Sequence, residues 1–335
     1  MKITKHYPIF ALFVCLCSVC SAQTATLQKD LAGVFDDPKF EHALWGVHVE
    51  DTASGEVVCA RNNEKFVIPA SNMKLFVEAT MLETFGPEFQ FETEIHTTGP
   101  IQDGVLNGSL IVRGGGDPSI GGRFHKNDRL YIFRQWAADL KKKGIKKIDG
   151  NIIGDDDLFD DAPYGKGWQW DDLPYWYAAK ISALSFNDNC IDLLIEPGRS
   201  VGAPAVIKAS PRTDYVTIDN QTVTLKRRPR SDRELKELVY RPSPDGRSIT
   251  VKGPVLTKQK RFQDWAAISN PTLYTVSVFR EVLIQQGIEV AGDAVDIDDM
   301  ARPPTEESRQ LVLTWKSPPL SKLLRVLLNN SQNLY

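Results

Sequence analysis

The sequence has few of the residues on which metal and redox chemistry depend. It contains five histidines and five cysteines among 335 residues. None of the histidines has the HExxH or HxH spacing of a zinc hydrolase. Cys59 and Cys190, which lie outside the N-terminal segment, have neither CxxC nor Cys/His spacing. We therefore predict no metal and no cofactor.

Other common signatures are also absent. No GxSxG nucleophile elbow is present, which argues against an α/β-hydrolase. The segment GGGDPSIGG lacks the GK[ST] ending of a P-loop and the GxGxxG of a dinucleotide fold, so we predict a turn there. The formal net charge of −3 provides no strong basic field, and nucleic acid is not predicted as a partner.

The composition is that of an ordinary globular protein, with 42% hydrophobic and 25% charged residues. A chain of 335 residues exceeds one comfortable core, so we expect two or three domains. No later stretch has the roughly 20 consecutive apolar residues of a membrane-spanning helix. Peripheral membrane association and the oligomeric state are left open by the sequence.

The N-terminus has the pattern of a secretory signal peptide over residues 1–22. MKITKH carries two lysines, PIFALFVCLCSVC follows with thirteen residues of almost no polarity, and SAQ supplies small residues for cleavage after Ala22. A lipoprotein anchored at Cys20 is the alternative, which Val19 fits poorly. The pattern predicts export, with the periplasm as the expected compartment. There, Cys59 and Cys190 either form a disulfide or remain two buried thiols.

Residues 45–60 predict a β-hairpin, because WGVHVED and EVVCARN alternate apolar and polar residues around the turn TASG. The segment KLFVEATMLETFG then has helical spacing and ends at Gly86. We expect its apolar side to be buried. Short strands separated by Gly and Asp turns follow from residue 90, and residues 195–260 suggest a small β-rich module. Helical spacing is also found in residues 129–144, 272–292 and 317–335.

Acidic clusters such as Asp155-Asp156-Asp157 and Asp160-Asp161 are interpreted as solvated turns, because a glycosidase needs carboxylates whose placement the sequence does not give. The remaining chemical candidate is S-x-x-K, which occurs once, at Ser71 and Lys74. On a helix this spacing places both side chains on one face. A serine hydroxyl needs a base to become a nucleophile, and lysine serves when burial lowers its pKa. Backbone N–H groups at the helix start add donors for an oxyanion. Alternatively, Ser71 only caps the helix and has no catalytic role.

A second hydroxyl and an amide should accompany such a pair, and two S-x-N triplets are present. Ser185-Phe186-Asn187 lies in a predicted turn that enters a buried strand. Ser331-Gln332-Asn333 follows the predicted helix LSKLLRVLLNN and lies in a predicted loop.

S-x-x-K followed much later by S-x-N resembles the penicillin-recognising serine acyltransferases. The segments PASNMKLF, VRGGGDP, DGNIIGDDDLFDD, GWQWDDLPYWYAAKISALSFNDN and NNSQNLY together resemble the D-alanyl-D-alanine carboxypeptidase/endopeptidase family of penicillin-binding protein 4 type, peptidase family S13. The resemblance covers nearly the whole mature chain. It implies an α/β (α+β) fold, with a penicillin-binding/β-lactamase-like transpeptidase domain whose antiparallel sheet is flanked by helices, and with inserted β-rich domains.

The resemblance also implies a domain arrangement. The catalytic domain would begin at residues 23–90 and continue, incomplete, at residues 266–335. An inserted second domain would occupy residues 91–265, with a small β-rich third domain nested at about 195–255.

The same resemblance implies site roles. Ser71 would be the acylated nucleophile and Lys74 its base, Ser331 would relay a proton to the leaving amine, and Asn333 would bind the substrate backbone and orient Lys74. In the segment WDDLPYWY, Asp172 and Tyr177 would contact the amino-bearing side chain of the substrate, with Asp171 as an alternative to Asp172. Alternatively, this segment has no binding role and is a surface loop anchored by an aromatic residue. The implied partners are peptidoglycan stem peptides, with β-lactams as inhibitors.

The sequence departs from the family in one respect. The family's third motif, K-[ST]-G, is not found in the 335 residues, and the sequence stops two residues after Asn333. We therefore expect a C-terminally truncated record of a serine-type D-Ala-D-Ala carboxypeptidase. A non-catalytic homologue that binds cell-wall peptides and a β-lactamase-like or esterase-like acyl-serine hydrolase are the alternatives.

Overall fold

The structure is a computed structural model that describes residues 26–227 and 237–335. The predicted signal peptide, residues 1–22, lies outside the described residues. The described residues divide into two compact units, with the boundary between Met73 and Lys74. Among the described residues, none of the helices combines the length and apolarity that crossing a membrane requires.

The first unit contains the predicted β-hairpin. Its elements are a helix over residues 26–35, η1 (Pro38–Phe40), β1 (Val47–Glu50), β2 (Val57–Arg61) and η2 (Ala70–Asn72). β1 and β2 pair antiparallel. In the turn between them, Asp51 Oδ1 accepts hydrogen bonds from the backbone N–H groups of Ala53 and Ser54. The hairpin predicted at residues 45–60 is therefore confirmed.

The second unit is built around a five-stranded mixed sheet. Its strand order is β16-β8-β6-β3-β17, with β6 parallel to β8, β8 parallel to β16, and antiparallel pairs elsewhere. The strand bounds are β3 (Glu92–Thr97), β6 (Leu110–Arg113), β8 (Ile152–Asp155), β16 (Ala294–Asp296) and β17 (Gln310–Lys316). The strands predicted after residue 90 are confirmed in this sheet, and so is the mixed α/β class.

Three smaller sheets complete the described part of the second unit. Short strands β4 (Ile101–Gln102), β5 (Val105–Leu106), β7 (Lys147–Ile148) and β15 (Glu289–Val290) form one of them. The next has the order β10-β9-β14, with β9 (Cys190–Glu196), β10 (Val206–Ser210) and β14 (Phe262–Ala267). The last has the order β11-β13-β12, with β11 (Thr217–Leu225), β12 (Val239–Pro242) and β13 (Ser248–Leu256). This last sheet lies in the predicted β-rich region; the domain boundaries drawn above remain predictions.

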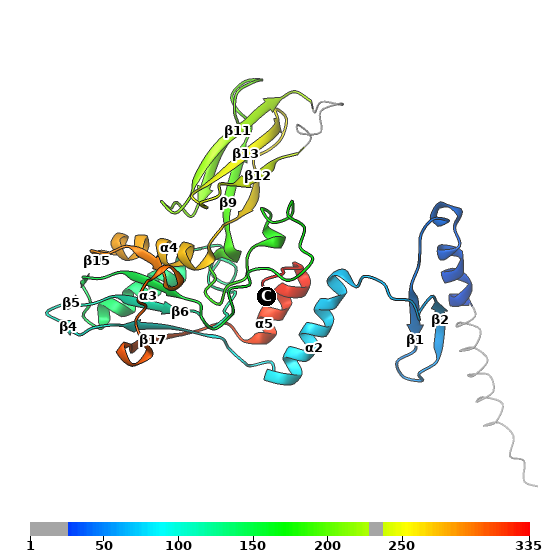
Figure 1. Cartoon of the computed structure of the whole chain (residues 1–335). Coiled ribbons are helices and arrows are strands. Elements are labelled where there is room, and N and C mark those ends of the chain that lie inside the picture. The colour runs from blue at the N-terminus through cyan, green and yellow to red at the C-terminus, as the bar shows by residue number, and fades with distance from the viewer. Residues whose placement is uncertain (1–25, 228–236) are drawn as a thin grey trace, which may run out of the picture. The chain divides into compact units, whose positions relative to one another are not determined.

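Two helices cover the five-stranded sheet (Figure 1). α3 (Tyr131–Lys142) packs against β17 and α4, and α4 (Pro271–Gln285) packs against β8 and β16. Asn270 caps α4 by accepting a hydrogen bond from Leu273 N. The aromatic rings of Phe133, Trp136 and Phe279 meet between the two helices and are fully buried, which anchors both helices to the main hydrophobic core.

The glycine-rich segment GGGDPSIGG is a tightly packed turn. A Cβ atom on Gly114 would lie 2.2 Å from Ala183 O, and one on Gly115 would lie 1.8 Å from Glu92 O. Only glycine allows the backbone to approach so closely. Asp117 in the same turn is buried, and burial raises the pKa of its carboxyl group to about 6 despite hydrogen bonds from Ser119.

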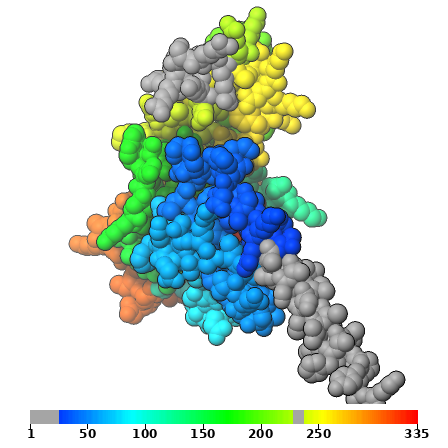
Figure 2. All heavy atoms as spheres, turned by 90° about the vertical axis from the view of Figure 1, so that its right-hand side faces the viewer, coloured from blue at the N-terminus to red at the C-terminus, as the bar shows by residue number. Residues whose placement is uncertain are grey.

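α2 (Met73–Phe85) confirms the helix predicted after Ser71, and it ends before Gly86, whose φ of 77° suits glycine. Its apolar side, however, is not buried as predicted. Within the second unit, Met81 and Leu82 pack against α5 (Leu320–Asn329), which lies beside α2 (Figure 1), while Phe76 is 68% exposed. The pale-blue atoms of this stretch lie at the molecular surface in Figure 2. The prediction was wrong because, among the described residues of the second unit, α5 contacts one side of α2 and leaves Phe76 on the other side exposed.

Asp155 corrects a second expectation, because this residue is not part of a solvated turn. It ends β8, is 1% exposed, and forms an ion pair with the buried guanidinium of Arg309. Arg309 also donates from Nη2 to Pro304 O at 3.0 Å. The charge of Asp155 is therefore compensated inside the protein rather than by water.

Replacing Arg309 should destabilise the second unit strongly. Arg309→Met leaves the Asp155 carboxylate buried without its partner, and we expect a loss of about 3–5 kcal/mol in the free energy of unfolding. Lys142→Met is the matched control, because Lys142 pairs with Asp139 on the surface of α3 and should cost at most about 1 kcal/mol. Urea unfolding followed by circular dichroism measures both, and equal losses would contradict the role of the buried pair.

Candidate functional site

Ser71, the predicted nucleophile, lies at the entrance to α2. It is exposed and belongs to the 3-10 turn η2, which runs directly into the helix because Met73 N donates to Ala70 O and Ser71 O. Ala70 has a φ of 45°, a left-handed conformation that is strained for a residue other than glycine. Lys74, the predicted base, follows at the second position of α2 and is the first residue of the second unit.

Lys74 is hydrogen-bonded to the predicted S-x-N motif. Its Nζ donates to Asn333 Oδ1 at 2.5 Å, although the two residues are 259 positions apart in the sequence. Partial burial lowers the pKa of the Lys74 amine below its ordinary value. A lysine that loses its proton more readily is better suited to act as a base.

Asn333 continues the hydrogen-bond chain. Its Nδ2 donates to the backbone carbonyl oxygen of Tyr177 at 2.7 Å. Both ends of the Asn333 amide are thus held, the oxygen by Lys74 and the nitrogen by Tyr177, which fixes the orientation of the side chain.

The segment that supplies Tyr177 is anchored to the β10-β9-β14 sheet. Tyr175 forms a β-bridge with Ala266 of β14, and Ala267 N donates to Pro174 O at 2.9 Å. The 3-10 turn η3 (Trp176–Ala178) follows. The rings of Tyr175 and Tyr177 are stacked, with centroids 5.7 Å apart and planes 3° from parallel. This stack and the bridge hold Tyr177 in position.

Asp172 and Tyr177 form a direct contact. The Tyr177 hydroxyl donates to Asp172 Oδ1 at 2.8 Å. Burial, followed by this hydrogen bond and the charge of Asp172, raises the pKa of the Tyr177 phenol to about 12, so the phenol keeps its proton at neutral pH. Asp171, the alternative to Asp172, is exposed. The structure therefore links Lys74, Asn333, Tyr177 and Asp172 in one chain.

The two S-x-N triplets have different surroundings. Ser331 lies in the loop after α5, as predicted, and is exposed with a φ of 51°. Ser185 is buried, donates to Ser182 O and accepts from Asn189 Nδ2. The first triplet therefore belongs to the hydrogen bonding of the turn before β9, and the second is the one that reaches Lys74.

No sequence pattern indicates the contact made by the Tyr177 carbonyl. A backbone oxygen is present at every residue, so no residue type marks it. The motif S-x-N likewise leaves its middle position open, so it does not indicate that Gln332, between Ser331 and Asn333, is buried.

Among the described residues, one group of carboxylates lies close enough to hold a metal ion. Oxygen atoms of Asp156, Asp296 and Asp298 lie within 4.8 Å of one another. Asp156 Oδ2 already accepts from Ser182 and Thr272, and Asp296 Oδ2 accepts from Asn270. Cys59 and Cys190 carry free thiols in the structure, and burial raises the pKa of Cys190.

A lysine one turn after a serine at a helix start, hydrogen-bonded to the asparagine of an S-x-N loop, is typical of penicillin-recognising serine enzymes. A family model confirms this class. The chain belongs to the D-Ala-D-Ala carboxypeptidase 3 (S13) family, whose model matches residues 27–335.

Two relatives resemble the chain over most of its length. It is 27% identical over 288 residues to the D-alanyl-D-alanine carboxypeptidase DacB of Haemophilus influenzae. The matched region covers 86% of this chain and 56% of that protein. It is 28% identical over 285 residues to a D-alanyl-D-alanine carboxypeptidase of Actinomadura sp. The matched region covers 83% of this chain and 50% of that protein. The chain thus spans about half the length of these relatives.

Solved structures agree with the fold. The crystal structure of penicillin-binding protein 4 (dacB) from Haemophilus influenzae superposes with a TM-score of 0.71 at 26% identity, covering 86% of this chain and 60% of that one. A second crystal structure of that protein, complexed with a β-lactam, has a TM-score of 0.64 at 24% identity, covering 86% of this chain and 58% of that one. The predicted penicillin-binding fold is therefore confirmed.

Proposed function

We propose that this protein is a serine-type D-Ala-D-Ala carboxypeptidase/endopeptidase that cleaves peptidoglycan stem peptides or cross-links through an acyl-serine intermediate and is acylated by β-lactams. The observation that carries the proposal is the hydrogen bond from Lys74 to Asn333, which joins the S-x-x-K motif to the S-x-N motif. Membership of the S13 family and the names of the two relatives support it.

The proposed reaction has two steps. Lys74 takes the proton of Ser71 Oγ, which attacks the carbonyl carbon of the penultimate D-alanine. The C–N bond to the terminal residue breaks, and the leaving amine receives a proton through Ser331. Water then cleaves the ester and restores Ser71. With a β-lactam the same attack opens the ring, so the amine stays attached; the β-lactam complex of the Haemophilus influenzae protein is in keeping with this step.

Asn333 is proposed to hold the substrate backbone and to orient Lys74. The hydrogen bond to the Tyr177 carbonyl supports a fixed amide, because a rotated amide would present N–H groups to the Lys74 ammonium. Asp172 is proposed to bind the amino group of the substrate side chain, with Tyr177 as the neighbouring aromatic residue. A carboxylate and an ammonium form a charge-assisted hydrogen bond.

Export by a cleaved signal peptide and a periplasmic location are part of the proposal, because peptidoglycan lies outside the inner membrane. They rest on the pattern of residues 1–22. N-terminal sequencing of the native protein tests them, and a mature chain that begins at Gln23 is the expected result.

Ser71→Ala should abolish covalent labelling of the full native protein by a fluorescent penicillin, because the acceptor oxygen is removed. Ser200→Ala, at an exposed loop position, is the control and should be labelled like the wild type. Labelling is read from denaturing gels.

Three other outcomes would contradict the proposal. Labelling that persists in Ser71→Ala would exclude this serine as the nucleophile. Peptide binding by the wild type without acylation would favour the non-catalytic homologue. Rapid hydrolysis of penicillin without cleavage of a D-Ala-D-Ala peptide would favour the β-lactamase-like alternative.

The rate of acylation should increase as the pH rises through the pKa of Lys74, because only the neutral amine accepts the serine proton. Partial burial lowers that pKa below its ordinary value of 10.5, so the midpoint of the rise should lie below pH 10.5. Lys74→Arg should slow acylation about 100-fold or more, because arginine keeps its proton. Stopped-flow measurement with a fluorescent penicillin tests this, and Lys322→Arg, exposed on α5, is the control. An unchanged profile in Lys74→Arg would refute the assigned base.

Asp172→Asn should raise the KM for a peptide with a free side-chain amine about tenfold, and it should not affect the same peptide with that amine acetylated. Asparagine still accepts a hydrogen bond from Tyr177, so the local structure is retained. Asp171→Asn is the matched control and should leave both KM values unchanged. If Asp171→Asn instead raised the KM for the free-amine peptide and Asp172→Asn did not, Asp171 would be the residue that binds the substrate amine.

A further inference from the structure

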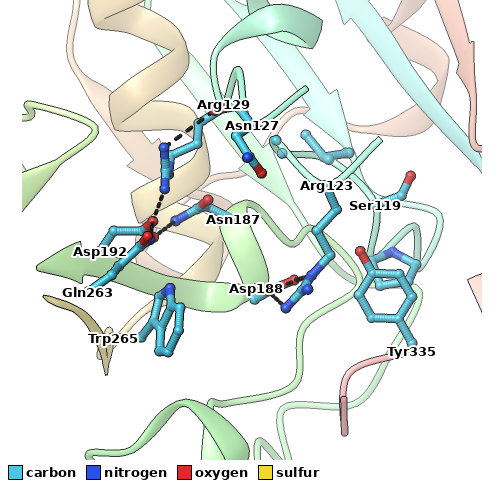
Figure 3. Close-up of a pocket in the computed structure, with 14 residues that line it drawn as sticks. Ser119, Arg123, Asn127, Arg129, Asn187, Asp188, Asp192, Gln263, Trp265 and Tyr335 are labelled. Carbon is cyan, nitrogen blue, oxygen red and sulfur yellow. Dashed lines mark hydrogen bonds and ion pairs between the residues drawn. The ribbon is translucent and has the colours of Figure 1, made fainter. Parts of the chain in front are cut away.

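Two adjoining pockets lie in the second unit, next to the S-x-N loop. The first has a volume of about 340 Å³ and the second about 330 Å³. Arg123, Asp188 and Trp265 line both pockets, and Figure 3 shows these three residues around the first. Gln332 of the S-x-N loop lines the second. The pair of pockets therefore extends from the residue between Ser331 and Asn333 to β14.

The charged groups of these pockets are neutralised within the walls. Arg123 Nη2 donates to Asp188 Oδ2 at 2.6 Å, and its Nε donates to the same oxygen at 3.0 Å. Arg129 is paired with Asp192, which is 5% exposed. Walls with paired charges provide little net attraction for an ion and leave many hydrogen-bonding groups for a neutral polar ligand.

The residues between the pockets are held in an unusual backbone conformation. Asn187, Asp188 and Asn189 have φ values of 51°, 56° and 52°. Three consecutive left-handed residues are costly, and Asn and Asp tolerate this conformation better than most side chains. The turn directs Asp188 to Arg123, while Asn187 Nδ2 donates to Asp192 Oδ1 at 2.7 Å (Figure 3). Strain of this kind is typical of sites that bind ligands.

Gln332 provides a buried donor. Its side chain is 0% exposed, its Oε1 accepts from Leu334 N at 3.2 Å, and its Nε2 has no acceptor among the described residues. A buried amide nitrogen without a partner is unfavourable, so an acceptor oxygen on a ligand in the second pocket would satisfy it.

Trp265 provides a flat apolar surface. It lies on β14 opposite Asp192 and is 39% exposed, although its ring borders both pockets. An indole face next to amide, carboxylate and guanidinium groups matches a sugar ring, which has apolar C–H faces and a rim of hydroxyl groups. An N-acyl group on such a sugar has a carbonyl oxygen that could accept from Gln332 Nε2.

We propose that these two pockets form a subsite for an N-acylated sugar of the glycan strand to which the stem peptide is attached. The subsite rests on the proposed function, because the stem peptide of peptidoglycan is attached to a sugar of the glycan strand. Trp265 stacks on the sugar, and Gln332 donates to its acyl carbonyl.

The test compares two substrates of the full native protein, a pentapeptide alone and the same pentapeptide attached to its disaccharide. We expect a KM about five- to tenfold lower for the disaccharide-linked peptide. Trp265→Ala should raise that KM to the value of the free peptide while leaving the free peptide and penicillin acylation unchanged. Trp265→Phe should retain part of the effect, because it keeps an aromatic face.

Val206→Ala is the matched control, because Val206 is 44% exposed in the same three-stranded sheet and lines neither pocket. Equal KM values for the two substrates, or an equal effect of Trp265→Ala on both, would overturn the proposal. An effect of Trp265→Ala confined to a cross-linked peptide dimer would assign the pockets to a second peptide instead. If the wild-type protein is not acylated by penicillin, the proposed function itself is wrong. This outcome is distinct from failure of the sugar subsite, in which acylation is normal.

Discussion

The hydrogen bond between Lys74 and Asn333 requires two residues 259 positions apart to meet. Closing a chain segment of that length costs about 5 kcal/mol in entropy, whereas one hydrogen bond to a charged group contributes about 1.5–3 kcal/mol. This hydrogen bond alone is therefore too weak to bring the two residues together. The intervening residues must fold into a stable body that brings α2 and α5 side by side.

Short backbone links set the relative position of these two helices within the second unit. The segment after α2 is bonded to the segment before α5, because Leu320 N donates to Phe89 O at 2.8 Å and Ser317 N donates to Phe91 O at 2.9 Å. Met81 and Leu82 of α2 then pack against the apolar face of α5. The loop that ends α5 carries Asn333 to Lys74. The η3 turn approaches from the β10-β9-β14 sheet and fixes the other end of the asparagine amide.

Two buried carboxylates of the second unit are paired with arginines inside the protein. Asp155 has Arg309, and Asp192 has Arg129 together with the amides of Asn187 and Gln263. Such pairs add little net stability compared with apolar residues, but they restrict which arrangements of strands and loops are acceptable. Around the two pockets such pairs leave a neutral, strongly hydrogen-bonding surface.

The sequence by itself determined the local elements and the chemical motifs. The alternation in residues 45–60 identified the hairpin, the apolar period after Ser71 identified α2, and the spacing of Ser71 and Lys74 follows from one helical turn. These features depend on near neighbours in the chain. The segments resembling the S13 family also led to Asn333, Asp172 and Tyr177, and the family itself is confirmed by the match to residues 27–335.

Only the tertiary structure decided what depends on distant contacts. It brought Asn333 to Lys74 across 259 positions, and it revealed the Tyr177 carbonyl as the second partner of Asn333. Asp155 was predicted to be solvated but is buried in the structure. One side of α2 was predicted to be buried but is exposed. Burial is set by which surfaces meet across the fold, and the period of a single segment does not contain that information.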